Sequence, residues 1–354
     1  MSSLPDAQHA WEWTFRADDA GRPLAPLFQR LLMLDVVGSP TRADAVRLEE
    51  SLSSLEQQFS YGPDGLLTCL AWGPGWFERH ASVRSPVARP LPMARWENPV
   101  LEDIDACLHL ASDHEDHLTR ATELLFGPGP LDQRERLRIR ETRTGFVGRG
   151  LPAERAPGRR VPAKAPLMLG FHSGLRGNQA TEERITVEDG PLAGGTTMHV
   201  SYIVLDLDSW YEQDPDTRTA HMYAPGISTE AAEALVDDAK SHADDLPALA
   251  ATHGVAGHAQ ATGRARLDGQ PRINRRDFAT NDHGSPGTHF VSLQRSMEDF
   301  NATRAVMNAA DATGYHSGIG VRRNNGINAF MDVRSRATFA VPRRRDRAFP
   351  YLAE

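Results

Sequence analysis

The order in which apolar runs and helical patterns follow one another is the feature that most constrains the fold of this chain. Residues 31–37 form an apolar run that ends at Gly38-Ser39-Pro40, which predicts a buried strand and a turn. Thr41, with Asp44 three residues later, is typical of a capping box, and apolar residues recur every three or four positions as far as Phe59. We therefore expect a strand followed by an amphipathic helix.

The rest of the first half continues this order. Apolar runs at 66–72 and 105–111 predict two further strands, and residues 73–77 (Gly-Pro-Gly-Trp-Phe) are expected to turn away from the first of them. Residues 112–116 (Ser-Asp-His-Glu-Asp) can cap a second helix that runs to Phe126. The order strand, helix, strand, strand, helix is that of a ferredoxin-like α+β unit.

A second unit of the same kind is expected after a connection. Residues 149–166 are rich in proline and basic residues and lack apolar periodicity, so they read as a linker between an N-terminal domain, 1–148, and a C-terminal domain, 167–354. The second domain has strand patterns at 198–207 and 288–294 and helical patterns at 228–239 and from Ser296 onward. The expected fold class is α+β, with two ferredoxin-like domains.

Composition excludes several classes of partner. The 39 Lys and Arg residues and 47 Asp and Glu residues give a net charge of −8, which argues against a nucleic-acid binder. The start of the sequence lacks a secretory signal, and no window is apolar enough to span a membrane. Cys69 and Cys107 lie in apolar segments, as buried free thiols do, so we expect a cytoplasmic protein.

Three segments, in this order, resemble the dye-decolorising peroxidase (Dyp-type) family of haem proteins. Residues 169–174 (Leu-Gly-Phe-His-Ser-Gly), followed by Asn178, are similar to the family's Gly-Phe-x-Asp-Gly loop and its downstream Asn. His258, after a glycine, stands where the family carries its iron-ligating histidine, and residues 273–278 (Ile-Asn-Arg-Arg-Asp-Phe) resemble its Ile-Leu-Arg-Arg-Gly-Tyr stretch. The strand and helix from residue 287 onward resemble those that close the haem pocket.

The resemblance implies a haem b cofactor and assigns roles to individual residues. His258 would be the axial ligand of the iron, and neutral imidazole is a common ligand there. Arg275 would lie on the opposite, distal side, where its charge stabilises an anionic ligand, although Arg276 could exchange roles with it. Gly174, Asn178 and Phe290 would contact the cofactor. Hydrogen peroxide and an organic donor would be the substrates, and the resemblance also allows a homo-oligomer.

One position departs from the family pattern. Where the family presents an aspartate as acid and base, this chain has Ser173, whose hydroxyl does not titrate near neutral pH. The sequence therefore predicts a divergent peroxidase with weak activity, with His172 as a nearby substitute for the missing acid. Two alternatives stay open. One is a non-peroxidase haem enzyme acting on a small iron-bound nitrogen or oxygen ligand, as aldoxime dehydratases do with a distal serine. The other is a non-catalytic haem-binding or interaction protein.

Replacing Ser173 tests this interpretation. We expect Ser173→Asp to raise peroxide turnover with an organic donor by up to about 10²-fold, because it adds a titratable acid and base. An unchanged peroxide turnover, together with the loss of a different native activity, would instead indicate a site built around serine.

Overall fold

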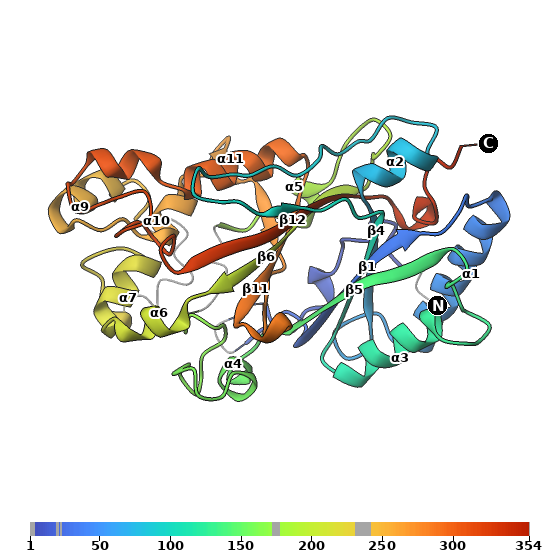
Figure 1. Cartoon of the computed structure of the whole chain (residues 1–354), viewed down its shortest axis with the longest axis horizontal. Helices are drawn as coiled ribbons and strands as arrows, with labels where there is room; N and C mark the ends of the chain where they lie inside the picture. The colour runs from blue at the N-terminus through green and yellow to red at the C-terminus, as the bar shows by residue number, and fades with distance from the viewer. Residues whose placement is uncertain (1–3, 19–20, 22, 172–177, 231–241, 354) are drawn as a thin grey trace.

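Eight antiparallel strands of this chain form a closed barrel in the computed structural model, which describes residues 4–18, 21, 23–171, 178–230 and 242–353 (Figure 1). The strands follow one another around the barrel in the order β10-β5-β1-β4-β2-β12-β6-β11, and pairing between β10 and β11 closes it. Their bounds are β1 (Phe28–Val36), β2 (Leu67–Trp72), β4 (Ala106–Ser112), β5 (Leu137–Phe146), β6 (Thr196–Leu205), β10 (Phe278–Thr280), β11 (Gly287–Gln294) and β12 (Met331–Val341).

Four short strands lie outside this closed path. β9 (Ile273–Arg275) extends the sheet beyond β11, and β3 (Val100–Leu101) pairs in parallel with β12. β7 (Arg266–Leu267) and β8 (Gln270–Pro271) form a separate hairpin. These strands place the segment that contains Arg275 at an edge of the sheet.

Both halves of the chain contribute strands to this one barrel. β1, β2, β4 and β5 come from the first half, and β6, β10, β11 and β12 come from the second. The barrel interior joins apolar side chains of both halves, Met33 and Cys107 of the first and Val200, Phe278 and Phe339 of the second. It also buries His109 and His289, whose rings lie against Phe278. The α+β class is confirmed, whereas the division into domains 1–148 and 167–354 stays a prediction.

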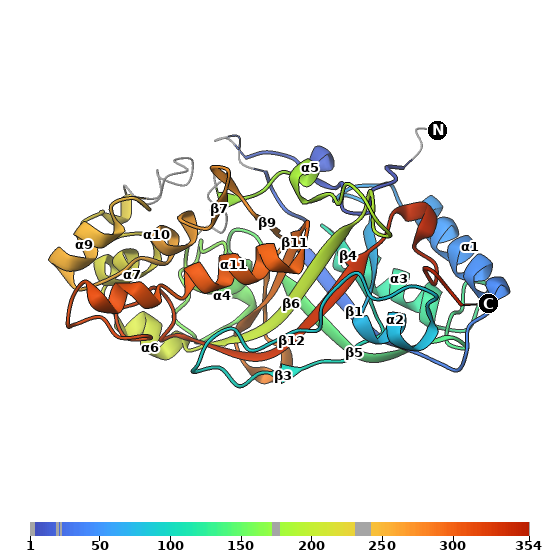
Figure 2. The same ribbon diagram turned by 90° about the horizontal axis from the view of Figure 1, so that it is seen from above.

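Helices cover the barrel and extend it at one end. In Figures 1 and 2, α1 and α3 lie at one end of the molecule, and α7, α9 and α10 lie at the other. The helices are α1 (Arg42–Gln58), α2 (Pro74–His80), α3 (Glu115–Phe126), α4 (Leu151–Arg155), α5 (Glu182–Ile185), α6 (Leu207–Glu212), α7 (Pro215–Met222), α9 (Leu246–His253), α10 (His258–Gly263) and α11 (Met297–Met307). None of the described helices is both long and apolar enough to cross a membrane.

Most predicted elements of the first half are present, with one correction. Residues 73–77 do not simply turn, because Pro74 occupies the first position of α2, where its fixed φ favours a helix and no hydrogen bond is lost. α3 ends at Phe126 as expected, and its N-cap is His114, which lies within the predicted capping segment 112–116. The Ser112 hydroxyl accepts a hydrogen bond from the His114 amide at 3.1 Å.

In the second half, β6, β11 and α11 confirm three predicted elements, and Ser296 caps α11 by accepting a hydrogen bond from the Asp299 amide. The predicted helix at 228–239 lies mostly outside the described residues. The predicted linker, 149–166, contains the short helix α4 and buries Ala156 and Ala165. Part of the connection is therefore packed, and Ala156 belongs to a cluster that includes Phe146 of the first half and Leu205 of the second.

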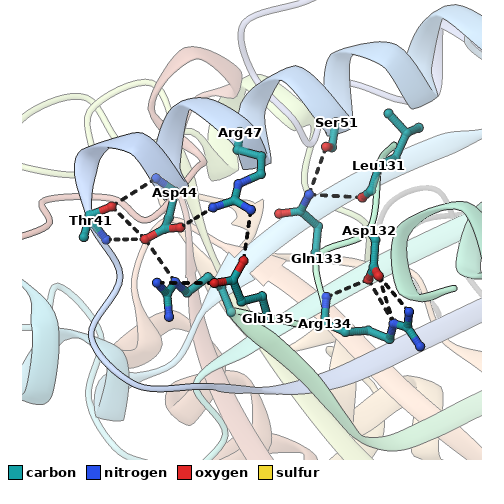
Figure 3. Close-up of polar contacts among 10 residues, drawn as sticks. Thr41, Asp44, Arg47, Ser51, Leu131, Asp132, Gln133, Arg134 and Glu135 are labelled. Atoms are coloured by element: carbon teal, nitrogen blue, oxygen red, sulfur yellow. Dashed lines mark hydrogen bonds and ion pairs between the residues drawn. The ribbon is translucent and has the colours of Figure 1, made fainter. Parts of the chain in front are cut away.

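The N-terminus of α1 shows how local hydrogen bonds define an element (Figure 3). The Thr41 hydroxyl accepts from the Asp44 amide at 3.3 Å, and an Asp44 carboxylate oxygen accepts from the Thr41 amide at 2.8 Å, as the sequence predicted. Asp44 is buried, and it also pairs with Arg47 at 2.9 Å and with Arg136 at 3.0 Å. Burial by itself raises the pKa of Asp44, but the hydrogen bonds from Thr41 and the charge of Arg136 outweigh it and hold the pKa below its ordinary value.

We expect Asp44→Asn to lower the free energy of unfolding by about 1 kcal/mol at pH 7. Because the pKa of Asp44 is depressed in the folded state, its stabilisation is complete above the unfolded pKa of about 3.8 and is lost as pH falls through the folded pKa. Urea unfolding at pH 7 and pH 3 should therefore show a difference between native and variant that shrinks in acid. Glu50→Gln, at an exposed position of the same helix, is the control. If Asp44→Asn lowered the free energy of unfolding equally at pH 7 and pH 3, the ionised Asp44 carboxylate would not be the source of the stabilisation.

Candidate functional site

A large pocket lies between the outer face of the barrel and the helices α10 and α11. Ile203 of β6 and Phe290 of β11 form its sheet side, and they alternate with Val200 and Val291, which point into the barrel. Met307 of α11 lies on the helical side. The empty space between the lining residues, the open mouth included, is about 1350 Å³, and most of its lining is apolar. The pocket is thus a mostly apolar recess that is open to solvent.

The segment 273–279 divides its side chains between the pocket and the opposite face. The pocket is lined by alternate residues, namely Ile273, Arg275, Asp277 and Ala279. Arg276 points the other way, where its guanidinium lies 4.2 Å from the Trp11 ring centroid and pairs with Glu182 at 2.9 Å. The period of two in an extended chain explains this division. Of the two candidate arginines, Arg275 therefore faces the pocket and Arg276 does not.

Gln179 holds the backbone of Arg275 in place. Its side-chain oxygen accepts from the Arg275 amide at 2.9 Å, and its side-chain nitrogen donates to the Arg275 carbonyl at 3.2 Å. The same oxygen lies 3.4 Å from Nε of Arg275. This pairing joins the segment after the predicted Gly-Phe-x-x-Gly loop to β9.

His258 is the first residue of α10 and faces the pocket from the helical side. Gly257 is the N-cap of this helix, and its amide donates to the side chain of Gln260 at 3.0 Å. Burial, together with the charges of Arg275 and Arg304, lowers the pKa of His258 to about 3. Within the described part of the chain, no group hydrogen-bonds the His258 ring. The imidazole is therefore neutral at physiological pH, as a metal ligand must be.

Gly326, which has a left-handed backbone conformation, packs directly against the backbone of His258. Gly326 has φ +54°, and a Cβ atom placed on it would lie 3.2 Å from Cα and 3.3 Å from Cβ of His258. The Gly326 amide donates to the Ala256 carbonyl at 2.7 Å, and Nδ1 of buried His221 donates to the Gly326 carbonyl at 2.9 Å. The backbone around His258 is thus fixed by direct contact with a distant segment.

The pocket brings together four of the residues predicted for the site, His258, Arg275, Asn178 and Phe290. Asn178 also accepts from Nη2 of Arg266 at 3.2 Å. His172, Ser173 and Gly174 lie outside the described residues, although Phe171 and Asn178 on either side of that segment both line the pocket.

Three charged residues of the pocket were missed by the sequence analysis. Arg266, Arg272 and Asp277 all line it. The alternation after Arg275 could have identified Asp277, since the side chain two residues further along an extended segment points to the same side. No comparable signal marks Arg266 or Arg272. In the described residues, no three His, Cys, Asp or Glu side chains converge on one point, so His258 lines the pocket without a cluster of other metal-binding residues.

We expect Gly326→Ala to destabilise the fold by about 2–3 kcal/mol, since it adds a strained backbone and a close contact with His258. Gly269→Ala is the matched control, because Gly269 also has positive φ, at +74°, but no heavy atom lies within 4 Å of the added Cβ. Urea unfolding should show a loss of only about 1 kcal/mol for the control. If the two variants lost the same free energy of unfolding, the contact with His258 would not contribute to the destabilisation by Gly326→Ala.

Solved structures of dye-decolorising peroxidases are similar to this one over nearly its full length. The dye-decolorizing protein from V. cholerae matches with a TM-score of 0.62 and 18% identity, covering 92% of this chain and 97% of that chain. A DyP-type peroxidase from Cellulomonas bogoriensis matches with a TM-score of 0.62 and 22% identity, covering 90% of each chain. A DypB variant from Rhodococcus jostii RHA1, in complex with heme, matches with a TM-score of 0.63 and 16% identity, covering 99% of this chain and 100% of that chain.

At these identities the similarity establishes the fold, and it confirms that the chain resembles the Dyp-type peroxidases. No curated protein matches the sequence. One family model, described as a family of unknown function (DUF7405), matches residues 26–343. The chain therefore belongs to the DUF7405 family, and it has the fold of the Dyp-type peroxidases.

Proposed function

We propose that this protein binds haem b in the pocket beside α10, with His258 as the ligand of the iron, and uses hydrogen peroxide to oxidise an organic donor. The observation that carries the proposal is the neutral imidazole of His258 at the wall of a large apolar pocket. The fold shared with Dyp-type peroxidases supports it, and so does the bound heme in the DypB structure.

The residues that line the pocket fit the chemistry of haem. Haem is a flat apolar ring with two carboxylate groups and an iron atom that takes an axial ligand. Ile273, Phe290 and Met307 offer apolar contacts to such a ring. Arg266 and Arg272 carry positive charges suited to its carboxylates. We assign these residues to holding the cofactor.

The residues of this chain then have distinct roles in the reaction. Haem supplies the iron that exchanges electrons with peroxide and with the donor. One hydrogen peroxide takes up two electrons and two protons and yields two waters. Arg275 stabilises the negative charge that develops on peroxide as it loses a proton. Burial keeps His258 unprotonated, so its ring nitrogen is available to the iron at neutral pH.

We also propose the cytoplasm as the compartment. Cys69 and Cys107 are both free and buried, on the neighbouring strands β2 and β4 of the barrel. Burial raises the pKa of Cys69 to about 11, so its thiol stays protonated and unreactive. Unpaired thiols of this kind are typical of proteins from a reducing compartment.

The absorption spectrum after haem supplementation tests the function. We expect the native protein to show a Soret band with about one haem per chain, and His258→Ala to lose or shift this band because the iron loses its ligand. His253→Ala, at an exposed position at the end of α9, is the control and should leave the spectrum unchanged. A native protein without a Soret band would refute the proposed function.

A further inference from the structure

We propose that Asp277 is the residue that accepts and returns protons in this pocket, an inference that rests on the proposed haem function. Asp277 lines the pocket together with His258 and Arg275. It is half-buried and lies two residues beyond Arg275, on the pocket side of the segment 273–279. Among the described lining residues it is the only carboxylic acid.

Among the described lining residues, the other charged groups and the imidazole are unsuited to this task. They are Arg266, Arg272, Arg275 and His258. The guanidinium groups stay protonated at any physiological pH, so they cannot accept a proton. Under the proposed function, the iron occupies the reactive nitrogen of His258.

The hydroxyl groups of the pocket are also excluded as bases near neutral pH. They belong to Thr262, Thr288, Thr303 and Tyr223. Aliphatic hydroxyls do not titrate in this range, and phenols do so only near pH 10. A carboxylate is ionised at neutral pH and can take up a proton during a reaction. Asp277 is therefore the described group whose chemistry matches proton transfer.

The proposed step moves one proton within hydrogen peroxide. The Asp277 carboxylate accepts the proton of one peroxide oxygen and returns it to the other oxygen as the O–O bond breaks. The electron pair of that bond goes to the departing oxygen, which leaves as water. Haem, when bound, would supply the two electrons that the remaining oxygen takes up. Asp277 ends the step in the state in which it began, while Arg275 stabilises the intermediate charge.

Cyanide binding to the haem-loaded full chain tests this role without measuring turnover. Cyanide enters as a neutral weak acid near pH 7 and binds ferric iron as the anion, so a base in the pocket has to take its proton. We expect Asp277→Asn to slow cyanide association at pH 7, followed by the Soret shift, by about 10²-fold. The equilibrium Soret shift at saturating cyanide should be the same in the native protein and the variant, because the iron and its ligand are unchanged.

Two further variants make the outcome specific. Asp277→Glu keeps a carboxylate and should retain most of the rate. Asp268→Asn makes the same chemical change in an exposed turn with φ +53°, a conformation that asparagine adopts readily, and should leave the rate unchanged. Removing a negative charge beside Arg275 favours anion binding, so slower association in Asp277→Asn cannot arise from charge alone.

The result also separates the two proposals. If the native protein and Asp277→Asn both show the Soret band but bind cyanide at the same rate at pH 7, the role of Asp277 is refuted and the haem function stands. If the native protein shows no Soret band, both proposals are refuted together.

Discussion

Closure of the eight-stranded barrel is the constraint on which the rest of the structure depends. β10 closes it by pairing with β5 on one side and β11 on the other, so the strands from the two halves complete one hydrogen-bonded ring. The interior is filled by apolar side chains such as Met33, Val200 and Phe339. The candidate pocket lies on the outer face instead, where β6, β9 and β11 meet α10 and α11.

Buried ion pairs also join the two halves of the chain beside α11. Glu97, from the first half, is buried between Arg304 of α11 and Arg336 of β12, at 2.8 Å from the latter. Burial raises the pKa of Glu97, but the two arginines outweigh it and keep the carboxylate ionised. Arg304 in turn contributes to the low pKa of His258. An acidic residue far away in the sequence thus balances a charge that acts on the candidate iron ligand.

The sequence predicted best where the signal is local. Thr41 with Asp44 and Ser296 with Asp299 mark helix starts that the structure confirms. β5 was not predicted, because charged residues such as Arg143 and Glu141 interrupt its apolar pattern, and the two are paired at 2.7 Å in the folded chain. The pocket residues His258 and Arg275 came from the resemblance to a family. The support of His258 by Gly326 depends on a tertiary contact that no local pattern reveals.

The alternation along 273–279 has a consequence for how this protein can evolve. The side chain of each residue there lies either in the pocket or on the opposite face, so a single substitution changes the side chains of only one face. Inserting or deleting one residue would exchange the sides, placing Arg276 in the pocket and Asp277 against Trp11. The length of this segment is therefore constrained by both faces at once, whereas each of its residues is constrained by one face only.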